Sequence, residues 1–191
     1  MSLLIIGIVI FIGTHLLAML LRGPRDRLLA RLGEGPYKGL FSLVSVIGLG
    51  LMIYGFYTTR GMLEPDDYLY TPAPWTRHAA MGLVLLAFIF IGASHGKGYL
   101  KLWLKQPMSI GFGLWALAHL LANGERPDVY LFGSILVLAV LDIILSTARG
   151  LVPQHEPQVK SDIRAVIIGV ILYLVFLFVI HPYVFKVPVL T

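Results

Sequence analysis

Six apolar stretches constrain the fold of this 191-residue chain more than any other feature of its sequence. Each is close to the roughly 20 residues that a helix needs to cross the hydrocarbon core of a bilayer. They are Leu3–Leu21, Leu40–Tyr57, His78–Ala93, Met108–Ala122, Val129–Ala148 and Ile163–Ile180. Because backbone groups in lipid must find hydrogen bonds within the chain, we expect an all-α polytopic membrane protein. A single domain over residues 1–191 would be a bundle of six transmembrane helices.

The composition also favours a membrane protein. Hydrophobic residues make up 58% of the chain and charged residues 13%, whereas soluble domains average about 45–50% and about 25%. The chain contains no cysteine, which excludes disulfides and thiolate metal ligands. Its net charge of +5 arises from short loops between apolar stretches, so we expect the lipid bilayer, and no nucleic acid, as a partner.

The distribution of cations predicts the orientation in the membrane. Most of the fifteen Lys and Arg residues fall in the loops after the first, third and fifth apolar stretches. They are Arg22, Arg25, Arg27, Arg31, Lys38, Lys97, Lys101, Lys105, Arg149, Lys160 and Arg164. The positive-inside rule therefore places both termini outside and these three loops in the cytoplasm. Residues 23–36 form a basic amphipathic segment, which we interpret as a topology anchor on the cytoplasmic leaflet or as a clamp for propionates or headgroups.

Two histidines lie inside apolar stretches, where an ionisable side chain loses its water and needs a partner. His15 lies in the first stretch, and His119 lies in the fourth, within WALAHLLANG. At about 1.5 Å per residue, His15 is about 18 Å from the outer surface and His119 about 16–17 Å from the inner one, so both are near the middle of the membrane. Imidazole binds iron, copper and zinc and is a standard axial ligand of haem. Two neutral histidines bonded to neighbouring helices are the other interpretation.

Three further residues are candidate contributors to a site around this pair. Asp142, in the fifth stretch, is nearly level with His15 by the same arithmetic. It could accept the second N–H of a ligating histidine, pair with another core group, or relay protons. Trp115 and Asn123 share the helix face of His119.

The remaining four histidines are expected to reach water. His78 and His95 lie at the two ends of the third stretch. Interfacial solvation is their expected role, and alternative ligation of a metal is the other possibility. His155 lies in a loop between two prolines, and His181 ends the sixth stretch. We interpret both of these as structural residues.

Four segments of the sequence carry a resemblance to a known family. They are HLLAMLLRGPRDRLLARLGEGPYKGLFSLVSVIGLGLMIYGF (His15–Phe56), PWTRH (Pro74–His78), KQPMSIGFGLWALAHLLANGE (Lys105–Glu125) and YLFGSILVLA (Tyr130–Ala139). Together they resemble the NnrU family of bacterial membrane proteins. The segment WALAHLLANG, followed by an LFG motif, is specific to that family. The resemblance covers nearly the whole chain. It implies a multi-pass protein of the bacterial inner membrane that is linked to nitrite and nitric oxide reduction, that is, to denitrification.

The family is in turn similar to the plant zeta-carotene isomerases, which hold haem b and isomerise a cis double bond in a redox-dependent way. By motif, the two main haem ligands of those enzymes fall on His15 and His119. The resemblance therefore implies haem b as the cofactor of this chain, with the two histidines as metal ligands. Arg22 and Arg25 on the inner side, or Arg77 and Arg126 on the outer side, could hold the propionates. Nitric oxide or a small apolar substrate would be the partner of the iron.

The chain departs from the isomerases at two motif positions. Their cysteine three residues before the second ligand is Ala116 here, and their histidine before Pro107 is Gln106. Isomerase activity on a carotenoid is therefore not carried over, and redox or isomerase-like haem chemistry stays open. Two rival functions also stay open. One is a membrane assembly factor without haem, and the other is a small transporter or proton pathway that uses Asp142 and the intramembrane histidines.

Overall fold

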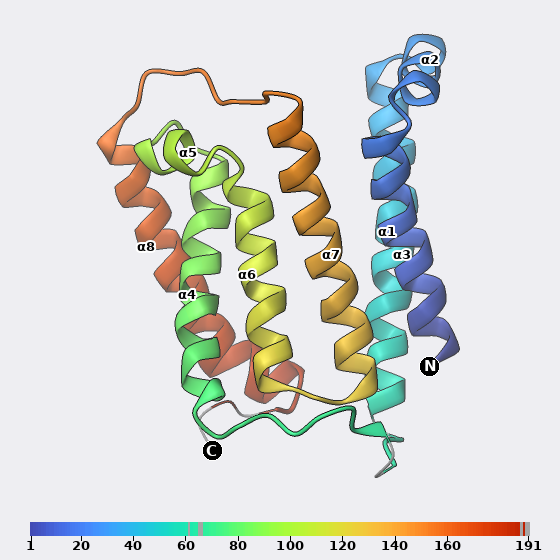
Figure 1. Ribbon diagram of the computed structural model, residues 1–191, viewed down its shortest axis with the longest axis vertical. Helices are drawn as coiled ribbons and strands as arrows, with labels where there is room; N and C mark the ends of the chain where they lie inside the picture. Colours follow the sequence, from blue (N-terminus) through green and yellow to red (C-terminus); the bar gives the residue numbers. More distant parts are fainter. Residues whose placement is uncertain (61, 65–66, 188, 190–191) are drawn as a thin grey trace. The chain divides into compact units, whose positions relative to one another are not determined.

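A computed structural model describes residues 1–60, 62–64, 67–187 and 189 (Figure 1). The long helices are α1 (Ser2–Leu20), α3 (Glu34–Arg60), α4 (Thr76–Ser94), α7 (Arg126–Ala148) and α8 (Val159–Val175), the last of which continues as the π-helix η2 (Phe176–Val184). The shorter helices are α2 (Arg22–Leu32), α5 (Tyr99–Leu104) and α6 (Pro107–Ala122). The described ranges contain helices and no β-strand, which confirms the predicted all-α fold class.

The helices are those of a polytopic membrane protein. Five of them are long and apolar enough to cross a membrane, with α8 and η2 counted as one helix. The one predicted span not among these five is the fourth, Met108–Ala122. It corresponds to α6, which is apolar but has 16 residues. At about 1.5 Å per residue it is about 24 Å long, shorter than a hydrocarbon core of about 30 Å. Pro107 begins α6, because the missing N–H of proline is tolerated in a first helical turn.

The chain divides into two compact units, each of which is described here by itself. Unit 1 is formed by Met1–Pro72 and Asn123–Leu138. It contains α1, α2, α3 and the first part of α7. Unit 2 is formed by Ala73–Ala122 and Ala139–Thr191. It contains α4, α5, α6, the remainder of α7, α8 and η2.

Glycines allow α1 and α3 to pack closely in unit 1. A Cβ atom at Gly7 would lie 2.8 Å from the carbonyl oxygen of Gly48, and one at Gly48 would lie 2.8 Å from the backbone nitrogen of Phe11. A Cβ atom at Gly55 would lie 2.7 Å from the carbonyl carbon of Leu3. The backbone of the opposite helix therefore occupies the space of a side chain. Such close approach is how transmembrane helices associate, because lipid gives them little hydrophobic driving force.

The central helix of unit 2 is α4, which packs against both α6 and α8. A Cβ atom at Gly111 of α6 would lie 2.9 Å from the carbonyl oxygen of Ala87, and one at Gly169 of α8 would lie 2.8 Å from the Cα atom of Ile89. Both glycines therefore contact α4 at nearly the same level. Both α6 and α8 run antiparallel to α4 (Figure 1), so the ends of α6 and η2 lie at the level where α4 begins.

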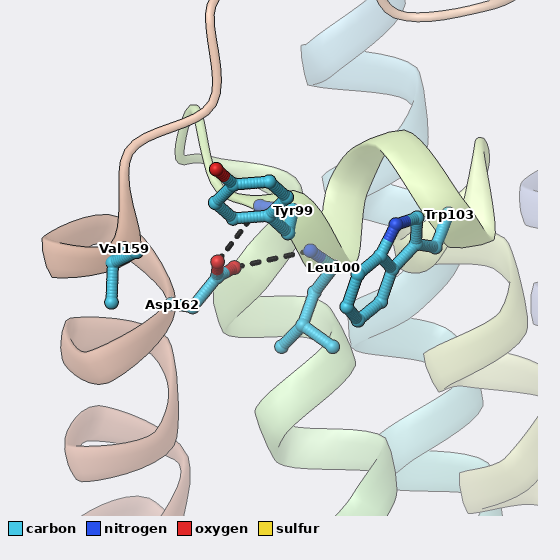
Figure 2. A pocket seen from close by; sticks show the side chains of 5 residues that line it. All are labelled: Tyr99, Leu100, Trp103, Val159 and Asp162. Carbon is cyan, nitrogen blue, oxygen red and sulfur yellow. Dashed lines mark hydrogen bonds between the residues drawn. The ribbon is translucent and has the colours of Figure 1, made fainter.

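The first turn of α8 holds the start of α5 (Figure 2). The carboxylate of Asp162 accepts hydrogen bonds from the backbone N–H groups of Tyr99, at 2.7 Å, and Leu100, at 3.2 Å. These N–H groups have no partner within a helix, so Asp162 caps α5 from another segment of the chain. A Cβ atom at Gly98 would overlap this carboxylate, which explains why the loop has a glycine beside the cap.

Candidate functional site

Both histidines predicted as ligands are held in one tautomer by their own helices. Nδ1 of His15 lies 2.7 Å from the carbonyl oxygen of Phe11, and Nδ1 of His119 lies 2.8 Å from that of Trp115. A carbonyl oxygen only accepts, so Nδ1 donates, and the lone pair of the neutral ring is then on Nε2. A ligating histidine has this arrangement, with one ring nitrogen toward the metal and the other donating to an oxygen.

His15 is half-buried on α1 in unit 1. Its ring lies 4.4 Å from that of Phe11 and 5.1 Å, edge to face, from that of Phe41 on α3, measured between ring centroids. Phe41 also borders a cavity of about 330 Å³ whose lining includes Arg25 of α2. Arg22, the predicted propionate partner on this side, is exposed as the first residue of α2.

His119 lies in the last turn of α6 in unit 2. The helix ends at Ala122, where the predicted span also ended. The indole of Trp115 lies 4.7 Å from the His119 ring between centroids, so the predicted neighbour on the same helix face contacts it. His119 is half-buried.

The structure brings a second imidazole to His119, and that residue is His181. The two ring centroids are 6.2 Å apart and the ring planes differ by 22°. His181 was interpreted from the sequence as a structural residue in reach of water. It is half-buried in η2, and its Nδ1 donates to the carbonyl oxygen of Phe176 at 3.1 Å. The sequence alone could have suggested that His119 and His181 are neighbours, because both lie at the predicted outer ends of apolar stretches.

The two predicted ligands belong to different units, His15 to unit 1 and His119 to unit 2. Their binding to a common iron therefore stays a prediction from the sequence. Asn123, predicted to share the face of His119, belongs to unit 1. There its carbonyl oxygen accepts a hydrogen bond from the hydroxyl group of Tyr70 at 2.7 Å.

Asp142 bonds to two serines within unit 2. Its Oδ2 accepts a hydrogen bond from the hydroxyl of Ser109 on α6, and its Oδ1 accepts one from the hydroxyl of Ser146, one turn further along α7, at 3.4 Å. The described partners of this carboxylate thus correspond to the pairing of core groups that was one of its three interpretations. Its role beside a ligating histidine or in a proton pathway stays a prediction.

The other predicted residues lie near the ends of helices. His78, in the first turn of α4, and His95, which follows α4, are exposed, as expected for interfacial residues. Nε2 of His155 donates to the carbonyl oxygen of Gly98 at 3.1 Å, so this histidine binds the inner loop of unit 2. Arg77, the predicted propionate partner on the outer side, is exposed in the first turn of α4.

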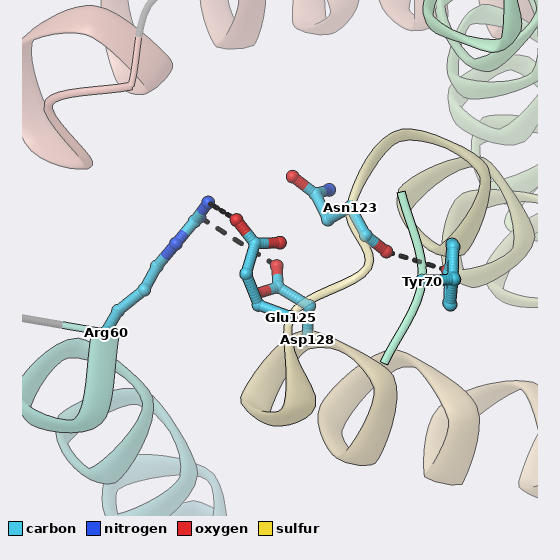
Figure 3. A network of polar contacts seen from close by, with 5 residues as sticks. All are labelled: Arg60, Tyr70, Asn123, Glu125 and Asp128. Atoms are coloured by element: carbon cyan, nitrogen blue, oxygen red, sulfur yellow. Dashed lines mark hydrogen bonds and ion pairs between the residues drawn. The ribbon is translucent and has the colours of Figure 1, made fainter. Parts of the chain in front are cut away.

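Sequence reasoning missed a polar network in unit 1 (Figure 3). Arg60, at the end of α3, pairs with Glu125 at 3.4 Å and with Asp128 at 3.8 Å. The side chain of Asp128 is 1% exposed, and its carboxylate has no hydrogen bond to any residue that the structure describes. Burial raises the pKa of the nearby Tyr70, and the charges of Asp128 and Glu125 raise it further. The signal was the opposite charges at the outer ends of two apolar stretches.

The donor set limits the kind of metal centre that the described residues support. Among them, no group of three or more His, Asp or Glu side chains is arranged to hold a metal ion. A haem needs only axial ligands from the protein. Haem ligation by His15 and His119 therefore stays a prediction from the sequence.

The comparisons with known proteins identify a family. The sequence matches the family model described as NnrU protein over residues 3–189. The chain belongs to the NnrU family. No curated protein and no solved structure matches it. The residues matched by the NnrU family model include His15, His119 and His181.

One described cavity of this NnrU-family chain lies beside α5. In unit 2, a cavity of about 430 Å³ is lined by Tyr99, Leu100, Trp103, Val159 and Asp162, and Figure 2 shows these side chains around the cap of α5. The carboxylate of Asp162 is already used by two backbone N–H groups. The geometry therefore indicates a structural role for these residues.

Proposed function

We propose that this chain binds haem b within the membrane and that His119 is an axial ligand of the iron. His15 is the second ligand predicted from the sequence. The observation that carries the proposal is the hydrogen bond from Nδ1 of each histidine to a carbonyl oxygen of its own helix. That bond makes Nε2 the unprotonated nitrogen of the neutral ring, which is the nitrogen that would bind iron, and it fixes the direction of the ring.

The surroundings of His119 support this function. A bound haem would supply one-electron redox chemistry and a position for a small molecule such as nitric oxide. The indole of Trp115 beside His119 offers an apolar surface for a macrocycle. Arg77 begins α4 at the end of unit 2 where α6 ends and carries a charge suited to a propionate.

We also propose that the protein acts in nitrite or nitric oxide reduction in a bacterial inner membrane. Membership of the NnrU family supports this role. Redox or isomerase-like chemistry on a small apolar substrate is a second form of the same haem function. Neither form requires Asp142, since serines satisfy its carboxylate within unit 2.

A visible spectrum tests the haem proposal. The full chain is expressed with a haem precursor, purified in mild detergent and assayed for a Soret band and a pyridine haemochrome of haem b. We expect the band in the wild type and its loss or strong reduction in His119→Ala. His95→Ala is the matched control, because His95 is exposed at the other end of unit 2. A folded wild type that stays colourless after incubation with haemin would refute haem binding.

The physiological role needs a separate experiment. Deletion of the gene is expected to slow the consumption of nitrite or nitric oxide by cells under denitrifying conditions, and the His119→Ala gene is expected not to restore it. Unchanged consumption in the deletion strain would refute the link to denitrification and leave the haem proposal standing.

A further inference from the structure

The imidazole nearest to His119 in unit 2 belongs to His181, and we infer that His181, in place of His15, is the second axial ligand of an iron bound at His119. This inference rests on the proposed haem function. Neither the family match nor the motif resemblance assigns a role to His181.

The packing on α4 explains why the two histidines meet. Gly111 and Gly169 contact α4 near Ala87 and Ile89 respectively, and both of their helices run toward the end where α4 begins. His119 follows Gly111 by eight residues, and His181 follows Gly169 by twelve. At about 1.5 Å per residue both histidines lie within about one turn of the start of α4. Close glycine packing thus fixes the level of both rings.

The separation of the rings agrees with ligands on opposite sides of one metal. Metal–nitrogen bonds are about 2.0–2.1 Å, and the ring centre lies about 1 Å beyond the nitrogen, so two trans imidazoles have centroids roughly 6 Å apart. Two imidazoles at a tetrahedral angle would bring their centroids to about 5 Å. The observed centroid distance is 6.2 Å. A distance of this size would suit His119 and His181 holding one iron between them.

Both rings also have the tautomer that ligation requires. Nδ1 of His119 donates to Trp115 and Nδ1 of His181 donates to Phe176. The lone pairs of both neutral rings are therefore on Nε2. The side chain of His181 reaches the carbonyl oxygen five residues back, within the nine-residue π-helix η2, which also contains Pro182. π-Helical segments are rare and frequently occur at functional sites.

Aromatic side chains surround the pair. Trp115 packs beside His119, and the ring of Phe185 meets that of His181 edge to face at 5.6 Å. These apolar surfaces suit a porphyrin, and Arg77 begins α4 at the same end of the unit. The chemistry assigned to His181 is thus neutral, nitrogen-based ligation in an apolar environment, with a propionate near Arg77.

Electron paramagnetic resonance of the haem-loaded, ferric full chain tests the inference. The wild type is expected to show a low-spin signal from two imidazoles. His181→Ala is expected to give a high-spin, five-coordinate signal, and added imidazole is expected to restore the low-spin form. Tyr183→Ala is the matched control in the same π-helix, because Tyr183 is 77% exposed, and its signal should equal that of the wild type.

A second variant keeps the test decisive if His181→Ala fails to fold. His181→Met is expected to stay six-coordinate and to raise the reduction potential, since methionine in place of histidine raises the potential of a haem. A folded His181→Met protein with an unchanged potential would overturn the inference. So would a low-spin His181→Ala protein, and loss of the low-spin signal in His15→Ala would then assign the ligand to His15. A wild type that binds no haem would refute the proposed function itself.

Discussion

Replacement of Gly48 by alanine should weaken the packing of α1 on α3. The new Cβ atom would lie 2.8 Å from the backbone nitrogen of Phe11, whereas carbon and nitrogen atoms in contact are usually about 3.5–4 Å apart. The two helices must therefore separate by roughly 1 Å or bend. Overpacking of this kind costs about 1–3 kcal/mol, and alanine returns up to about 1 kcal/mol through its higher helix propensity. We expect a net destabilisation of about 1–2 kcal/mol.

Gly50 provides the matched control on the same helix. No atom lies within 4 Å of a Cβ atom at Gly50, so Gly50→Ala should be neutral or stabilising by up to about 1 kcal/mol. Both variants are unfolded by SDS in mixed micelles and followed by circular dichroism, which gives their free energies of unfolding. Equal stability of Gly48→Ala and Gly50→Ala would refute the role of close backbone packing. Because Phe11 also binds Nδ1 of His15, Gly48→Ala tests the support of that ring as well.

Three further predictions concern the polar contacts. Arg60→Gln should destabilise the protein by about 2 kcal/mol, since it leaves Asp128 buried without a counter-charge. In SDS unfolding, the double variant with Asp128→Asn should recover most of this loss, and no recovery would contradict the pairing. Asp162→Ala should lower the free energy of unfolding by about 0.5–2 kcal/mol, because it removes the cap of α5. It should also speed hydrogen exchange of the first N–H groups of α5, and unchanged exchange would contradict the cap. Ser109→Ala should lower the melting temperature and leave any Soret band unchanged, and a shifted band would connect Asp142 to the iron.

Hydropathy predicted the helices well because lipid leaves the backbone few alternatives. The predicted span Leu3–Leu21 agrees with α1 (Ser2–Leu20) almost residue for residue. The second span began at Leu40, but α3 begins at Glu34, because a helix continues into the interface after its apolar residues end. Hydropathy also missed α5, which has six residues and depends on a carboxylate from α8.

The site was less predictable because its contacts join segments that are distant in the chain. The predicted span Met108–Ala122 ended where α6 ends, so the sequence already placed His119 in the last turn of its helix. The neighbourhood of His119 and His181 depends on how two helices pack on α4, which no single-helix pattern contains. Arg60 was counted only as a signal of orientation, and Asp128 was left out. Their ion pair joins α3 to α7.

The cap on α5 also affects how the protein is made. Asp162 belongs to the last long helix, so the N–H groups of Tyr99 and Leu100 receive their acceptor only after nearly the whole chain has been synthesised. Until α8 has been synthesised, the start of α5 therefore has no Asp162 carboxylate to bind. Reporter fusions that end the chain before α8, a common way to map membrane topology, would read this loop in an unfinished conformation. Full-length labelling of single introduced cysteines avoids that error, and the absence of native cysteine makes this chain ready for it.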